Sequence, residues 1–155
     1  MQRAIAIAIL KGSSTTIHNP SYCDDAIALI GIAKVLGFTI KKRSRYLELI
    51  PGSNNSEKFI LNFRESGLGI RMLSPILACQ KKSFVLTGIG SLKKRPMTMI
   101  ENGLRDLDVF VKSENGYLAK IQTATKINMN RNKMQGTCRE YKHLDDEWTF
   151  DVDEF

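Results

Sequence analysis

Apolar and polar residues follow one another in short runs that predict alternating helices and strands. Runs rich in β-branched and aromatic residues predict strands at residues 15–18, 38–40, 46–50, 58–63, 83–87, 109–111 and 117–121. Apolar residues at helical spacing predict helices at residues 24–36, 68–78 and 99–107. The segment from Arg3 to Leu10 alternates Ala with Ile, so a strand and a truncated buried helix remain equally open there. The pattern as a whole predicts a mixed α/β (α+β) fold.

The order of these elements repeats once along the chain. The succession helix, strand, helix, strand, strand runs from Arg3 to Ile50 and again from Arg71 to Ile121. Ile17 lies 69 residues before Leu86, whereas Leu47 lies 71 residues before Leu118. Such a period indicates a supersecondary module that buries its apolar face against copies of itself.

The repeat predicts the organisation of the chain. We expect a first repeat unit at residues 1–50, truncated at its N-terminus, and a second unit at residues 57–122, separated by the turn-rich segment Pro51–Ser56. Residues 123–155 are expected to form a partial third unit followed by an acidic, poorly ordered tail. Because two modules rarely close such a core, a further unit or another lobe is expected.

Positive charge is concentrated in the first 138 residues. The chain has 23 basic and 16 acidic side chains, a net charge of +7, and is 43% apolar. Residues 139–155 hold seven of the acids and two of the bases, so residues 1–138 carry a net charge of +12. A body this basic favours an anionic partner, such as a phosphorylated metabolite, nucleic acid or an anionic membrane surface.

The cysteines and the apolar N-terminus bear on the location of the protein. The chain has an odd number of cysteines: Cys23, Cys79 and Cys138. They are too widely spaced in the sequence for a zinc site or a disulfide framework, which favours a reducing cytoplasm. The apolar run that begins the chain is only seven residues long and lacks a cleavage site for a signal peptidase. No segment is long enough to span a membrane, so we expect a cytoplasmic protein without a membrane partner.

A basic turn at Ser91–Met97 is the main candidate for binding chemistry. It contains Lys93, Lys94 and Arg95 and leads into a predicted helix, in whose first turn Pro96 would fit. A helix start has unpaired N–H groups, and an arginine beside it could bind a carboxylate or phosphate with two hydrogen bonds. Spacing alone favours a solvated basic turn over a binding site.

Four stretches resemble the enolpyruvyl transferase family. Gln2-Arg3-Ala4 is similar to the end of a Lys-Ser-x-x-(Asn/Gln)-Arg-Ala segment, and residues 19–37 resemble the turn and second helix of the family. Residues 65–71 are similar to an Asn-x-Gly-Thr-x-x-Arg loop, and residues 86–97 to a Leu-Thr-Gly…Leu-x-x-Arg-Pro-(Met/Ile) motif. These stretches occur in the order and spacing of the family across about residues 2–122.

The resemblance implies both a fold and a reaction. Family members have lobes built from repeated βαβαββ units of the inverse α/β barrel type, and this chain would hold about two such units. The basic turn and Asp24-Asp25 fit the shikimate branch better than the UDP-sugar branch. In the shikimate branch, the enolpyruvyl group of phosphoenolpyruvate moves to the 5-hydroxyl of shikimate 3-phosphate and phosphate is released. No cofactor and no metal are implied.

The resemblance also implies three substrate-binding residues. Arg3 matches an arginine that helps to hold shikimate 3-phosphate, Gly67 a glycine whose backbone approaches phosphoenolpyruvate, and Arg95 an arginine that binds the phosphoenolpyruvate anion. No residue of the chain matches a catalytic group, and Asp24 and Asp25 are interpreted as residues of a helix start.

Several departures from the family pattern limit this expectation. The Lys-Ser pair would precede Gln2, the Ser-Ser-Gln motif expected after residue 130 is absent, and Glu65 and Leu68 stand where the family has Asn and Thr. The resemblance implies that the acid–base residues belong to a second lobe, which we expect to be missing from these 155 residues. We therefore expect an incomplete lobe that is inactive or nearly so alone.

A non-catalytic basic module that binds nucleic acid or other anions is the alternative. It would use the basic turns, and its affinity would fall steeply with salt. Aromatic residues are few and are not interleaved with the basic turns, so the sequence shows no stacking platform for bases. The sequence therefore favours phosphorylated small molecules as partners.

Overall fold

The computed structural model describes residues 1–80, 82–107, 109–113 and 121–124 of the chain. The helices are α1 (Gln2–Lys11), α2 (Asp24–Val35), α3 (Gly67–Ala78) and α4 (Thr98–Asp106), with a short 3-10 helix at Gly90–Lys94. The strands are β1 (Thr15–His18), β2 (Thr39–Lys42), β3 (Tyr46–Ile50), β4 (Lys58–Asn62), β5 (Ser83–Thr87) and β6 (Ile121–Ala124).

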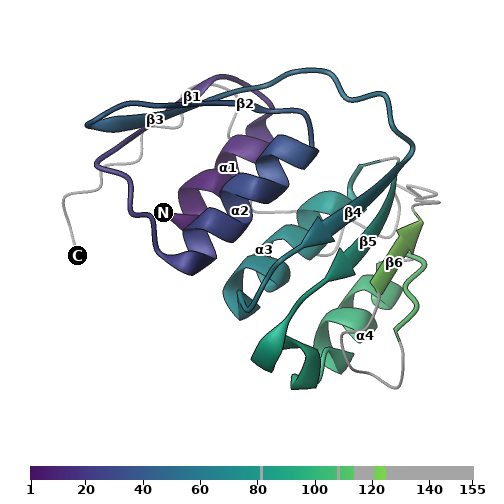
Figure 1. Ribbon diagram of the computed structural model, residues 1–155. Coiled ribbons are helices and arrows are strands. Elements are labelled where there is room, and N and C mark those ends of the chain that lie inside the picture. The colour runs from purple at the N-terminus through teal and green to yellow at the C-terminus, as the bar shows by residue number, and fades with distance from the viewer. Residues whose placement is uncertain (81, 108, 114–120, 125–155) are drawn as a thin grey trace, which may run out of the picture.

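These strands form two three-stranded sheets with helices between them. The first sheet has the order β1-β3-β2 with β3 antiparallel to both neighbours, and the second has the order β4-β5-β6, with β4 and β5 parallel and β6 antiparallel. Helices α1, α2 and α3 lie side by side between the sheets, and α4 packs against α3 in the second half of the chain (Figure 1). The α/β fold class predicted from the sequence is confirmed.

The ambiguous N-terminal segment is a helix. In α1, Ile5, Ala6, Ala8 and Ile9 are buried, whereas Ile7 and Leu10 are exposed. Buried positions at i, i+1, i+3 and i+4 describe one face of a helix, so the Ala/Ile alternation did not mark a two-sided strand. The helix ends at Gly12, whose φ of 61° is left-handed.

The core is formed where α1, α2 and α3 meet the inner faces of the sheets. Phe59 and Phe84 stand opposite each other in β4 and β5, and their rings stack with centroids 5.5 Å apart. The largest fully buried side chains come from both halves of the chain: Ile5, Leu29, Ile32, Leu47, Leu49, Leu61, Phe63, Ile70, Leu73, Leu77, Phe84 and Leu86. Because one apolar cluster spans both sheets, the halves stabilise each other.

Hydrogen bonds of Asn54 attach the segment between the sheets to the end of α2 and to the residue before β5. Asn54 Nδ2 donates to the carbonyl of Val35 at 2.8 Å, which occupies an acceptor at the end of α2. Lys82 Nζ donates to the carbonyl of Asn54 at 2.6 Å. The segment Pro51–Ser56, predicted as a boundary, is therefore held in place by hydrogen bonds to both halves of the chain. The division into units 1–50, 57–122 and 123–155 stays a prediction.

The last predicted strands differ from the observed ones. The predicted strand at residues 109–111 is reduced to one bridging residue, Phe110. Of the strand predicted at residues 117–121, only Ile121 is among the described residues, and it begins β6. In the backbone register Ile121 pairs with Leu86 as Leu47 pairs with Ile17, so the register makes Ile121 the counterpart of Leu47, for which the sequence repeat gave Leu118. Residues 117–120, and residues 125–155 of the expected third unit and tail, lie outside the described residues.

Pro96 does not lie in the first turn of α4, as had been predicted. Helix α4 begins at Thr98 with Met97 at its cap position, so Pro96 precedes the helix. Arg95 is extended, with φ −84° and ψ 131°, because the ring of a following proline disfavours the helical conformation. Arg95 consequently ends the 3-10 helix and does not lie at the start of α4.

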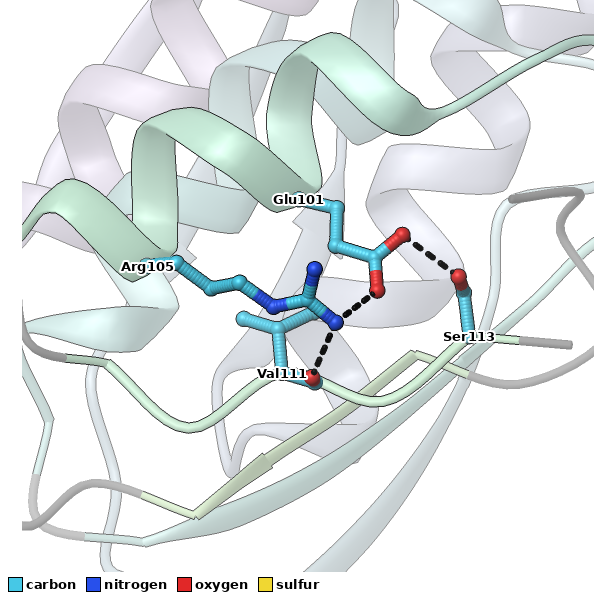
Figure 2. A network of polar contacts seen from close by, with 4 residues as sticks. All are labelled: Glu101, Arg105, Val111 and Ser113. Carbon is cyan, nitrogen blue, oxygen red and sulfur yellow. Dashed lines mark hydrogen bonds and ion pairs between the residues drawn. The ribbon is translucent and has the colours of Figure 1, made fainter. Parts of the chain in front are cut away.

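A buried carboxylate ties α4 to the segment that follows it (Figure 2). Arg105 Nη2 donates to Glu101 Oε1 and to the carbonyl of Val111, the latter at 3.4 Å. Ser113 Oγ donates to the other oxygen of Glu101 at 2.6 Å. The Glu101 side chain is 8% exposed and that of Arg105 is 54% exposed, so the acid is the buried partner. Both carboxylate oxygens are paired, as burial of a charge requires.

We expect Glu101→Ala to lower the free energy of unfolding by about 1–3 kcal/mol, because it leaves the part-buried hydroxyl of Ser113 and the guanidinium of Arg105 without their acceptor. Urea denaturation followed by circular dichroism measures the change. Glu57→Ala, which removes an exposed acid, serves as the control. Equal stability of the two variants would contradict a structural role of Glu101.

Candidate functional site

The starts of α1, α2 and α3 are joined by hydrogen bonds through Gln2. Gln2 Nε2 donates to Asp25 Oδ2 at 2.8 Å, and Ser66 Oγ donates to Gln2 Oε1 at 3.3 Å. Because both ends of its amide are used, Gln2 ties the first turn of α1 to the first turn of α2 and the cap of α3. The positive ends of three helix dipoles therefore gather at one end of the helix layer.

Ser66 shapes the start of α3. It is fully buried, and its hydroxyl accepts a hydrogen bond from the backbone N–H of Gly69 at 3.1 Å. This is the usual N-cap bond, which satisfies one of the free N–H groups of a helix start. The N–H groups of Gly67 and Leu68 have no partner among the described residues, so they remain able to donate to a ligand.

The side chain of Arg95 lies against this helix start. A methyl group in place of the hydrogen at Gly67 would lie 2.5 Å from Arg95 Nη1, closer than any van der Waals contact allows. The guanidinium thus occupies the space that the missing side chain leaves free. Arg95 and Gly67, predicted as parts of one anion site, are brought together across 28 positions of sequence.

Glu65 and Ser91 lie beside Arg95. The backbone N–H of Ser91 donates to Glu65 Oε2 at 3.0 Å, and Arg95 Nη2 donates to Ser91 Oγ at 3.4 Å. Hydrogen bonds from the side chain and backbone of Ser91 lower the pKa of Glu65 below its usual value of 4.5, with a smaller contribution from the charge of Arg95. Glu65 is therefore ionised at neutral pH, next to the proposed anion site.

Arg3, the third predicted binding residue, lies in the first turn of α1 and is exposed. It follows Gln2, which contacts Ser66, so its backbone lies at the same end of the helix layer as Gly67. Within the part of the chain that the structure describes, its side chain makes no hydrogen bond or ion pair. The role of Arg3 in substrate binding stays a prediction.

Sequence reasoning missed three residues of this region: Gln2, Ser66 and Ser91. A serine three positions before Gly69 has the spacing of an N-cap, so Ser66 had a local signal. The link between Gln2 and Ser66 joins residues 64 positions apart and had none. Asp25 lies in the first turn of α2 as predicted, but its carboxylate binds Gln2, and the cap residue Cys23 makes no side-chain cap bond.

The arrangement is suited to binding a small anion. A guanidinium, two free backbone N–H groups and a helix dipole converge where a side chain is absent. Phosphate and carboxylate groups both match these donors. Among the described residues no group of three His, Cys, Asp or Glu side chains is placed to hold a metal ion.

The chain was compared with known protein families. A sequence model of EPSP synthase (3-phosphoshikimate 1-carboxyvinyltransferase) matches residues 1–138. The chain belongs to the EPSP synthase family. A 3-phosphoshikimate 1-carboxyvinyltransferase from Methanobrevibacter smithii is 32% identical over 118 residues, which cover 74% of this chain and 27% of that protein. One from Thermoanaerobacter sp. (strain X514) is 33% identical over 123 residues, which cover 77% of this chain and 29% of that protein.

Solved structures agree with the EPSP synthase fold. The structure of EPSP synthase from Acinetobacter baumannii superposes with a TM-score of 0.66 at 23% identity, covering 80% of this chain and 30% of that chain. The matched region thus spans about a third of the length of these relatives or less. In the described part of the chain, no helix has both the length and the apolar character needed to cross a membrane.

Proposed function

We propose that this chain forms part of the substrate-binding half of an enzyme that transfers the enolpyruvyl group of phosphoenolpyruvate to shikimate 3-phosphate, a step of aromatic amino acid biosynthesis. Membership of the EPSP synthase family supports the reaction class. The observation that carries the proposal for this chain is the contact of Arg95 with Gly67 at the start of α3. It joins two motifs of the family into one anion site.

Each residue has a distinct role in this proposal. Arg95 binds the phosphoenolpyruvate anion with two N–H groups, and the free N–H groups of Gly67 and Leu68 donate to the same ligand. Gly67 lets the ligand approach the backbone because it has no side chain. Arg3 binds the phosphate of shikimate 3-phosphate. The 5-hydroxyl oxygen bonds to C2 of phosphoenolpyruvate as the methylene carbon gains a proton and the hydroxyl loses one, and C2 then releases phosphate as the new methyl group gives up a proton and the C=C bond re-forms. Donors that hold the negative charge of the phosphate therefore also favour the reaction.

A second lobe would complete the site. Enolpyruvyl transfer requires groups that move protons to and from the reacting atoms. The sequence contains no pair of residues that matches those groups, and the matched relatives are between three and four times as long as the region they share with this chain. We infer that the acid–base residues come from such a lobe, and that the protein works in the cytoplasm, where the exposed thiols of Cys23 and Cys79 stay reduced.

Calorimetry of the 155-residue chain with shikimate 3-phosphate, and then with phosphoenolpyruvate, tests this proposal. We expect binding in the millimolar range or tighter, with a rise in melting temperature that grows with ligand concentration. Sodium sulfate at equal ionic strength controls for nonspecific salt effects. A folded sample that shows neither heat nor a thermal shift at millimolar ligand would refute a retained binding site.

A further inference from the structure

Glu65 stands where the family pattern has an asparagine, and its place in the structure suggests why an acid is tolerated beside an anion site. Its carboxylate accepts the backbone N–H of Ser91, the second residue of the 3-10 helix that leads to Arg95. Gly90, with a left-handed φ of 54°, leaves room for the carboxylate, since any side chain there would overlap it. Glu65 directly precedes Ser66, the N-cap of α3. Its carboxylate thus attaches the turn before Arg95 to the start of α3.

Ser91 connects this carboxylate to the guanidinium. Its hydroxyl accepts a hydrogen bond from Arg95 Nη2 at 3.4 Å, and its hydroxyl proton is then free to be donated to Glu65. Glu65 and Arg95 form no direct ion pair within the described residues. The acid consequently acts on the arginine through Ser91 and leaves the guanidinium charge available to a ligand.

We propose that Glu65 is a positioning residue that, through Ser91, holds the Arg95 guanidinium against Gly67 in the orientation that binds an anion. The proposal depends on an acceptor oxygen at position 65 more than on its charge. A carboxylate that only competed with the ligand would form an ion pair with Arg95. Glu65 instead accepts the backbone N–H of Ser91. The ligand itself, phosphoenolpyruvate, rests on the proposed function, whereas the ordering of Arg95 does not.

Three variants separate these roles. Glu65→Gln keeps the acceptor oxygen and removes the charge, Glu65→Ala removes both, and Ser91→Ala removes the hydroxyl but keeps the backbone N–H. Glu57→Ala removes an exposed acid that precedes β4, at the opposite end of this strand from Glu65, and serves as the matched control for charge. Circular dichroism melts establish that each variant is folded.

The first measurement is the heteronuclear ¹⁵N NOE of the Arg95 Nε–H, assigned by its disappearance in Arg95→Lys. We expect an ordered side chain in the wild type, Glu65→Gln and Glu57→Ala, and a mobile one in Glu65→Ala and Ser91→Ala. If Arg95 is as ordered in Glu65→Ala as in the wild type, the proposal is wrong. If Glu65→Ala does not fold, Ser91→Ala decides the question by the same criterion.

The second measurement is the affinity for phosphoenolpyruvate by calorimetry. We expect Glu65→Ala to bind about 10-fold more weakly than the wild type and Glu65→Gln to bind within about 3-fold of it. Tighter binding by both variants would show that Glu65 is only a competing charge, and would overturn the proposal. No binding by the wild type would instead count against the proposed function, while the ordering of Arg95 would still decide the role of Glu65.

Discussion

Arg95→Ala is expected to weaken the binding of phosphoenolpyruvate by about 10- to 100-fold, the loss of a charged hydrogen-bonding partner worth about 1.5–3 kcal/mol. The arginine is exposed at the end of the 3-10 helix, and in the described chain its hydrogen bond to Ser91 uses only Nη2. Its remaining N–H groups are therefore available to a ligand, so truncation removes binding capacity without opening the core. Calorimetry measures the affinity.

Arg95→Lys separates charge from geometry, because lysine keeps the charge but lacks the planar fork that fits a carboxylate or phosphate. We expect it to bind more weakly than the wild type and more tightly than Arg95→Ala. Arg43→Ala removes an equal charge from the exposed turn between β2 and β3 and controls for the net charge of the protein. Equal losses in Arg43→Ala and Arg95→Ala would mean that the basic body attracts anions without a specific site.

The fold was largely readable from the sequence because its elements are short and strongly patterned. Helix α3 and strands β3 and β5 lie within a residue of their predicted bounds, since each combines a clear apolar period with turn residues on both sides. The pattern alone left α1 undecided between strand and helix, because its Ala and Ile residues alternate along the sequence, whereas the helix implied by the repeat order is confirmed. The pattern failed at Pro96, where a local preference of proline was assigned to the wrong position in the turn.

The candidate site was only partly readable. Gly67 and Arg95 could be selected by resemblance, but their contact depends on how β4, β5 and α3 pack, which no local pattern encodes. From the sequence, Arg95 was expected to lie beside the start of α4, the helix that follows it in the chain. In the structure the arginine turns back to the start of α3, so the relevant helix dipole comes from a segment that precedes Arg95 in the chain.

Gly67→Ala should weaken the binding of phosphoenolpyruvate by at least about 10-fold while changing the free energy of unfolding by no more than about 1 kcal/mol. The added methyl group would overlap Arg95 Nη1, the far end of a long exposed side chain, so the guanidinium can be displaced from its position at little cost to the fold. The same methyl group would stand where a ligand approaches the helix N–H groups. Calorimetry and urea denaturation measure the two quantities.

Gly103→Ala is the matched control for this substitution. Gly103 lies within α4, and an added methyl group there would meet no atom within 4 Å. It should raise stability by about 0.5–1 kcal/mol, as alanine does in a helix interior, and leave the affinity unchanged. A loss of affinity in Gly103→Ala similar to that in Gly67→Ala would indicate a general effect of helix substitution.

The double variant Gly67→Ala, Arg95→Ala shows whether the glycine acts through the arginine. If the methyl group weakens binding mainly by displacing the guanidinium, adding Gly67→Ala to Arg95→Ala should lower the affinity for phosphoenolpyruvate by less than about 3-fold. The reason is that both substitutions then remove the same interaction. If it mainly blocks the approach of the ligand to the N–H groups of α3, the two losses should multiply. Losses of affinity that multiply would show that the N–H groups at the start of α3 form a separate part of the anion site. Losses that do not multiply would show that Gly67 matters because it leaves space for the Arg95 guanidinium.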